Sequence, residues 1–145
     1  MRNNTNIIYR LGILIFFLFL GINLNAQNPK IFSVKRESKD YLVTKLLLNN
    51  DNLSSNFIRL NDEIEFLIQP QTTNNYTNNI NILAKRGKVS IKIINENNSL
   101  VEFIEVSELK PLNENFTQKL NANHKYKLLI KGEDFKGKIN LKWLK

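Results

Sequence analysis

Apolar and polar residues alternate along several stretches of this 145-residue chain, and this period of two is the feature that most restricts its fold. The alternation is clearest in residues 64–68, 89–93, 126–130 and 139–143. Weaker versions occupy residues 31–36, 41–48, 80–84, 100–106 and 115–120. Because successive side chains of a strand point to opposite faces, each stretch has one buried face and one solvent face. We therefore predict about eight short strands and no substantial helix.

The segments between these stretches carry turn residues. Residues 49–52 and 95–98 are rich in Asn, and Gly132 and Gly137 bracket another short segment. Asn tolerates the left-handed backbone conformation and glycine adopts it freely. We predict hairpins at 95–98 and 132–137, with Phe135 packed on a sheet edge, and a loop or edge covering at 70–79. The chain has 24 Asn, about one residue in six, and we expect them mainly in such turns.

Many short strands separated by turns indicate an all-β fold. We predict a single β-sandwich, jelly-roll-like, of about eight antiparallel strands, with a small ligand-holding barrel as the alternative. The hydrophobic fraction of 42% is sufficient for a globular core. The chain has no cysteine, so the sheets must hold together without a disulfide.

The end of the chain resembles a known family. Residues 116–130 read FTQKLNANHKYKLLI, and residues 135–141 read FKGKINL. This run resembles the closing strands of bacterial pre-peptidase C-terminal-type jelly-roll modules, in which a strand with leucine, a small residue and tyrosine precedes a glycine turn and a final strand. The resemblance implies a jelly-roll sandwich and an accessory role, since such modules are usually appended to secreted enzymes.

The first 26 residues have the organisation of a secretory signal peptide. Arg2 and Arg10 supply positive charge, residues 11–22 are apolar, and Ala26 is a small residue suited to cleavage. The apolar run is shorter than the roughly 20 residues that a membrane-spanning helix needs. We predict cleavage after Ala26, export to the periplasm or the exterior, and one domain over residues 27–145 without a membrane span. An uncleaved anchor is the alternative.

The positive charge is concentrated at the end of the chain. Residues 27–118 hold eleven basic and eleven acidic side chains, whereas residues 119–145 hold eight Lys and two acids. The alternation assigns the solvent phase to lysines in the last strands and in residues 88–92: Lys125, Lys127, Lys131, Lys138, Lys142, Lys88 and Lys92. If these strands share a sheet, their lysines form a surface for an anionic glycan, lipopolysaccharide or another envelope protein. The alternative is that they only keep the sheet soluble.

Few residues in the chain are suited to catalysis or metal binding. Without cysteine there is no thiolate ligand or nucleophile, and His124, the single histidine, lies in a turn-rich segment. The acids Asp62, Glu63 and Glu65 lie close together but lack the spacing of a calcium loop. We predict a protein that is not an enzyme and that has no metal or cofactor.

Two aromatic residues are candidates for sugar contacts. Trp143 shares its phase with Ile139 and Leu141, which favours the core. Tyr76 stands alone in the polar 70–79 segment and is the best candidate for an exposed aromatic residue. Nucleic acid is a poor candidate partner, because the aromatics fall on the inward phase instead of interleaving with the lysines.

These observations predict a small, exported, non-enzymatic binding or accessory module whose Lys-rich C-terminal face meets an anionic partner. One alternative is a carbohydrate-binding module that uses loop aromatics such as Tyr76. Another is a structural or adhesive subunit that assembles through strand edges. The sequence leaves the oligomeric state open.

Overall fold

The computed structural model describes residues 29–33, 41–108 and 111–144, and all its regular elements are β-strands. Residues 1–26 and the cleavage site at Ala26 lie outside these ranges, so the signal peptide remains a prediction. Within the described ranges, no helix has the length and hydrophobicity needed to cross a membrane.

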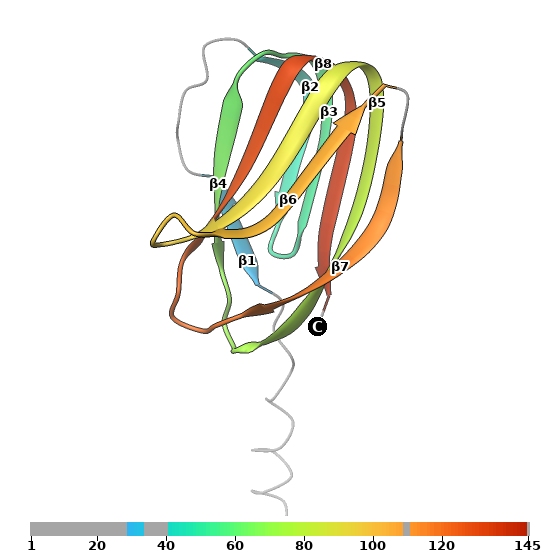
Figure 1. The fold of residues 1–145 in the computed structure, drawn as a ribbon. Helices are drawn as coiled ribbons and strands as arrows, with labels where there is room; N and C mark the ends of the chain where they lie inside the picture. Colours follow the sequence, from blue (N-terminus) through green and yellow to red (C-terminus); the bar gives the residue numbers. More distant parts are fainter. Residues whose placement is uncertain (1–28, 34–40, 109–110, 145) are drawn as a thin grey trace, which may run out of the picture.

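Eight strands make up the fold (Figure 1). They are β1 (Lys30–Ser33), β2 (Tyr41–Asn49), β3 (Asn52–Leu60), β4 (Glu63–Gln69), β5 (Asn74–Asn95), β6 (Leu100–Ser107), β7 (Leu112–Leu120) and β8 (Tyr126–Leu144). Every strand pairing is antiparallel.

Two strands, β5 and β8, are long enough to belong to both layers of the molecule. They pair with each other from Asn95 opposite Tyr126 to Thr77 opposite Leu144. Residues 88–95 and 126–131 form the centre of one sheet, with strand order β1-β4-β8-β5-β6. Residues 74–84 and 137–144 form the centre of the other, with order β2-β3-β8-β5-β7. We call them the front sheet and the back sheet, after their positions in Figure 1.

The core lies between the two sheets, because the inward positions of both are apolar. Buried side chains alternate with more exposed ones along β4, β5 and β8. Phe57 of the back sheet contacts Phe135 edge-on, with ring centroids 6.0 Å apart and an interplanar angle of 62°. The largest fully buried side chains are those of Trp143, Tyr76, Phe66, Phe135, Leu53 and Leu60. The predicted all-β, jelly-roll-like sandwich is confirmed.

The segment 132–137 is not a hairpin. It is the bend of the continuous strand β8, and Phe135 is buried in the core instead of lying on an edge. The bend of β5 lies beside it, where the pairing register shifts around Arg86. Gly87 there has a φ of +71°, and a Cβ atom would clash with the backbone carbonyls of Glu133 and Asp134. The glycines therefore mark a bend that carries two strands from one sheet into the other.

Two further parts of the fold differ from the sequence prediction. Residues 74–79 belong to β5 instead of a loop, and β3 was missed. In β3 the buried Ser55 interrupts the apolar phase, and a register shift between Phe57 and Leu60 breaks the alternation. Polar residues at inward positions conceal a strand from a pattern search.

The predicted hairpin at 95–98 is confirmed. Its turn is held by Asn95, whose side-chain oxygen accepts hydrogen bonds from the backbone N–H groups of Asn97 at 3.0 Å and Ser99 at 2.9 Å. Asn98 adopts the left-handed conformation with a φ of 60°. The hairpin joins β5 to β6 at one end of the front sheet.

Three neighbouring side chains bury polar atoms on the inward side of the back sheet: those of Asn78, Gln118 and Trp143. Asn78 pairs with Trp143 and with Phe116, and Gln118 is one pairing away, opposite Tyr76. Both amide atoms of Asn78 and of Gln118, and the Trp143 indole nitrogen, have no hydrogen-bond partner among the residues that the structure describes. A buried amide without partners loses its hydration without compensation. The trio therefore lowers the stability of this end of the core.

Substituting Gly87 should destabilise the fold. Gly87→Ala places a Cβ against two backbone carbonyls in a conformation that alone costs about 1–2 kcal/mol for an L-residue. We expect chemical denaturation to show a loss of at least that size. Lys85→Ala, at an exposed position of the same bend, is the control and should change stability by less than about 0.5 kcal/mol. Equal stability of the two variants would contradict the role of Gly87.

Removing the buried amide of Asn78 should, in contrast, stabilise the fold. Asn78→Leu replaces an unpartnered amide with an apolar side chain of similar size. We expect the free energy of unfolding to rise by about 1–3 kcal/mol in urea titrations. Asn79→Leu, one residue further along the same strand and exposed, should leave it nearly unchanged. A less stable Asn78→Leu variant would show that the amide is satisfied in solution.

Candidate functional site

The structure does not bring the seven predicted lysines together. Lys88, Lys92, Lys127 and Lys131 lie on the solvent side of the front sheet, which we call the front face. Lys138 and Lys142 lie on the solvent side of the back sheet, the back face. Lys125 is exposed in the turn before β8. The expectation of one shared surface is wrong because the bend of β8 places the two halves of one strand in opposite layers.

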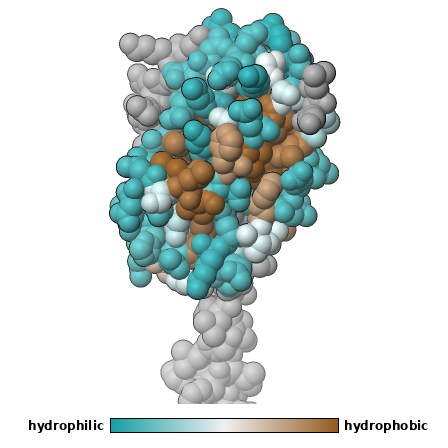
Figure 2. Space-filling view, in the orientation of Figure 1, coloured by the Kyte–Doolittle hydropathy of each residue, from teal (hydrophilic) through white to brown (hydrophobic). Residues whose placement is uncertain are grey.

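Cations and apolar side chains are mixed on the front face. One row across the strands contains Glu65, Leu129, Lys92 and Phe103. The next row contains Leu67, Lys127, Ile94 and Leu100. Figure 2 shows the result, an apolar patch in the middle of this face with hydrophilic residues around it. An exposed apolar patch rimmed by polar groups is typical of binding surfaces.

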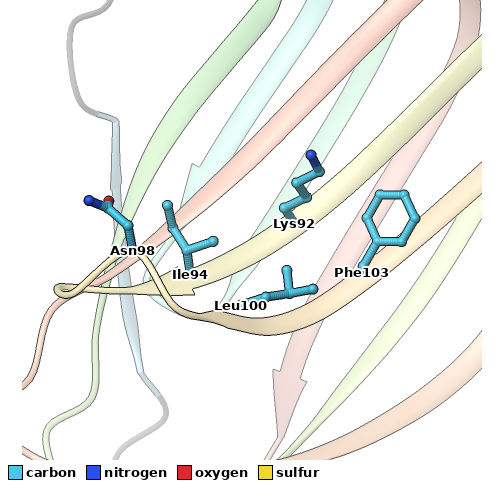
Figure 3. A pocket seen from close by; sticks show the side chains of 5 residues that line it. All are labelled: Lys92, Ile94, Asn98, Leu100 and Phe103. Atoms are coloured by element: carbon cyan, nitrogen blue, oxygen red, sulfur yellow. The ribbon is translucent and has the colours of Figure 1, made fainter.

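A hollow of about 420 Å³ opens on this patch beside the β5–β6 hairpin (Figure 3). Its apolar lining comes from Ile94, Leu100 and Phe103, of which Leu100 is 61% and Phe103 46% exposed. The polar residues of the lining are Lys92 and Asn98. The hollow is shallow and open to solvent, and like small-molecule sites it combines apolar walls with a few polar groups.

Lys92 is the strongest polar group of the hollow. Its Nζ lies 5.5 Å from the centre of the Phe103 ring, a cation–π contact that holds the side chain at this position. Its neighbours across the sheet are Leu129 and Phe103. Among the residues that the structure describes, no carboxylate lies within ion-pair distance of Lys92. The amine therefore keeps its capacity to bind an anion.

Acidic side chains accompany other lysines of the front face. Lys127 Nζ lies 3.7 Å from a carboxylate oxygen of Glu65. Lys131 is directly opposite Glu63 in the pairing of β4 with β8. These acids offset the attraction of an anion to that side of the face. Lys92, by contrast, has Leu129 and Phe103 directly opposite it in the strand pairings.

Tyr76 is not the exposed aromatic residue that the sequence predicted. It is 0% exposed, and its hydroxyl donates a hydrogen bond to the backbone carbonyl of Thr72 at 2.7 Å. Among the described side chains of the front face, Phe103 is the exposed aromatic residue, and the sequence analysis missed it. The available signal was its phase, which is opposite to that of the buried Ile104 and Val106.

The other residues considered in the sequence, Trp143 and His124, both make contacts within the fold. Trp143 is fully buried, as its phase predicted. His124 is exposed, and its Nδ1 lies 2.8 Å from a carboxylate oxygen of Glu96. Across the described ranges, no group of three or more histidine and acidic side chains is arranged to hold a metal ion.

Comparisons with known proteins add a likeness of fold. No family model and no curated protein matches the chain. A family 4 carbohydrate-binding module is 11% identical, with a TM-score of 0.44 and coverage of 83% of this chain and 86% of that one. A module of Cellvibrio mixtus lichenase 5A in complex with cellotriose is 13% identical (TM-score 0.43; coverage 80% and 94%). A family 61 module in complex with β-1,4-galactotriose is 13% identical (TM-score 0.44; coverage 84% and 97%).

At these values the likeness carries no argument about what this chain binds. The resemblance of residues 116–141 to pre-peptidase C-terminal-type modules stays a prediction.

The burial of Tyr76 leads to a test of its role. Tyr76→Phe removes the hydroxyl that bonds to Thr72, so we expect a loss of about 0.5–1.5 kcal/mol in unfolding free energy. The same variant should bind saccharides as the natural protein does, because the ring does not reach solvent. Tyr41→Phe, which alters an exposed tyrosine, is the control for stability. Weaker saccharide binding by a fully folded Tyr76→Phe variant would contradict this assignment.

Proposed function

We propose that this protein is an exported, non-catalytic binding module, and that the hollow beside Phe103 binds an acidic sugar. Export rests on the signal peptide predicted in residues 1–26. The observation that carries the ligand assignment is the Lys92 amine, which stands over the Phe103 ring without a carboxylate partner in the described part of the chain.

The lining of the hollow matches the chemistry of a sugar ring that carries a carboxylate. The C–H face of a pyranose ring is apolar and can pack on Phe103 and Leu100. The carboxylate can accept a charge-assisted hydrogen bond from Lys92. The Asn98 amide can donate to one hydroxyl and accept from another. Each kind of group on the ligand thus has a counterpart in the hollow.

Assembly through strand edges remains a separate prediction. Within the described residues, β2 pairs on one side only, with β3. It exposes Leu42 and Leu47, and Lys45 stands between them. Lysine on an edge strand opposes pairing with another copy. Lys45 therefore favours ligand binding at the front face over assembly at β2.

Two ligands that differ in one group test the proposal. Methyl β-D-glucuronide and methyl β-D-glucoside share a ring and differ only in the carboxylate. In NMR titrations, we expect the glucuronide to shift the backbone amides of Lys92, Asn98 and Phe103, and the glucoside to bind at least about tenfold more weakly. Raising the salt concentration should weaken the glucuronide complex, because the site is open to solvent.

Substitutions identify the contacts. Lys92→Met should reduce glucuronide affinity about tenfold or more, and Phe103→Ala should reduce the affinity for both ligands. Lys136→Met removes an exposed charge outside the hollow and should leave both affinities unchanged. Inorganic phosphate that binds as tightly as the glucuronide would show a simple anion site and overturn the assignment to a sugar.

A further inference from the structure

The back face carries an ordered array of amide side chains. One row across the strands contains Asn52, Lys142, Asn79 and Asn115. The next row contains Ser54, Asn140, Asn81 and Asn113. We call the six asparagines of these two rows the amide array. The expectation that asparagines collect in turns is therefore wrong for this sheet.

Composition alone does not explain this placement. An excess of asparagine in the chain would load both solvent faces, yet among the described residues the front face has none at its outward strand positions. Those positions hold Glu63, Glu65, Leu67, Gln69, Lys88, Ser90, Lys92, Ile94, Leu100, Phe103, Glu105, Ser107, Lys127, Leu129 and Lys131. Asparagine is also depleted from strands, because it fits the pleated surface poorly. Asparagines that face solvent on only one of the two sheets therefore indicate that this face has a function.

The back face also differs in charge. Its outward strand positions include Lys45, Lys119, Lys138 and Lys142, and no acid occupies an outward position of the described back-sheet strands. On the front face, by contrast, Glu63, Glu65 and Glu105 are interspersed among the lysines. A neutral polar lattice with cations and without acids complements a chain that carries hydroxyls and negative charges.

Much of the hydrogen-bonding capacity of the array is unused. Ser54 donates a hydrogen bond to the side-chain oxygen of Asn140 at 2.6 Å. The side-chain amides of Asn79, Asn81, Asn113 and Asn115 have no hydrogen-bond partner within the described part of the protein. Each amide offers two donor hydrogens and one acceptor oxygen, which suits hydroxyl groups. Neighbouring side chains within a row lie about 4.8 Å apart across the sheet, and the two rows lie about 6.7 Å apart along the strands, so the amides can meet hydroxyls along an extended ligand.

We propose that the back face binds an extended acidic polysaccharide, which lies along the amide array with its carboxylates near Lys138 and Lys142. Since the two faces are on opposite sides of the sandwich, one molecule then holds two chains and cross-links them. The back-face site stands on the array alone, whereas cross-linking also rests on the front-face function proposed above. A polyanion that binds by charge alone would not need the asparagines.

Variants of exposed residues separate the two faces. The front variant combines Lys92→Met with Phe103→Ala, and the back variant combines Lys138→Glu with Lys142→Glu. A third variant, Asn79→Ala with Asn81→Ala and Asn113→Ala, removes amides without changing charge. Lys125→Glu with Lys136→Glu is the control, because it makes the same charge change as the back variant outside both faces. Light scattering establishes that each protein is monomeric.

Binding to alginate, a polymer of uronic acids, measures the back-face site. In the front-variant background, we expect the back substitutions to weaken alginate binding about tenfold or more, the amide substitutions to weaken it several-fold, and the control to leave it unchanged. Unchanged binding after the back substitutions would overturn the site. Loss with the lysines but not with the amides, or equal binding of single-stranded DNA, would overturn its assignment to a polysaccharide.

Agglutination of alginate-coated beads measures cross-linking. The natural monomer should agglutinate the beads, and the front and back variants should each bind them without agglutination. A natural monomer that binds without agglutinating the beads would overturn cross-linking. If the front variant agglutinates as well as the natural protein, the front-face function fails while the back-face site can still stand on its own affinity data.

Discussion

The hydrogen-bonded pairing of β5 with β8 organises the whole molecule. Each sheet takes its two central strands from this pair, and all other strands attach to one half of it or build outward from there. The pair must therefore bend sharply at one level, and Gly87 allows this because its backbone lies against the carbonyls of the partner strand. The bend sets the stacking of the sheets, and through it the position of every surface residue.

The alternation of residues was sufficient to predict the class of fold. In 89–93 and 126–130 it gave both the strand and its buried face correctly, because these segments are central and are covered on one side only. It could not separate a hairpin from a bend at Gly132 and Gly137, since both use glycine and both allow two consecutive exposed residues, here Glu133 and Asp134. β3 was not predicted because Ser55, which is buried in it, is polar and interrupts the apolar pattern.

The candidate sites were harder to predict from the sequence than the fold was. Alternation tells which side of a strand faces solvent, but not which sheet that strand belongs to at a given residue. Lys127 and Lys138 both occupy solvent-facing positions of β8 and nevertheless lie on opposite faces, because the bend lies between them. Tyr76 was misjudged because its neighbours are polar, although it shares its phase with the buried Ile80. Phe103 and the asparagine rows required the strand register, which only the structure supplies.

The shared use of β8 also governs when the protein can fold. β8 is the last strand along the chain, and it is central to both sheets. A growing chain that lacks residues 126–144 has neither sheet complete, and its other strands expose apolar faces. Long-range pairing of this kind closes slowly. Such a chain therefore cannot complete either sheet before residues 126–144 have been synthesised.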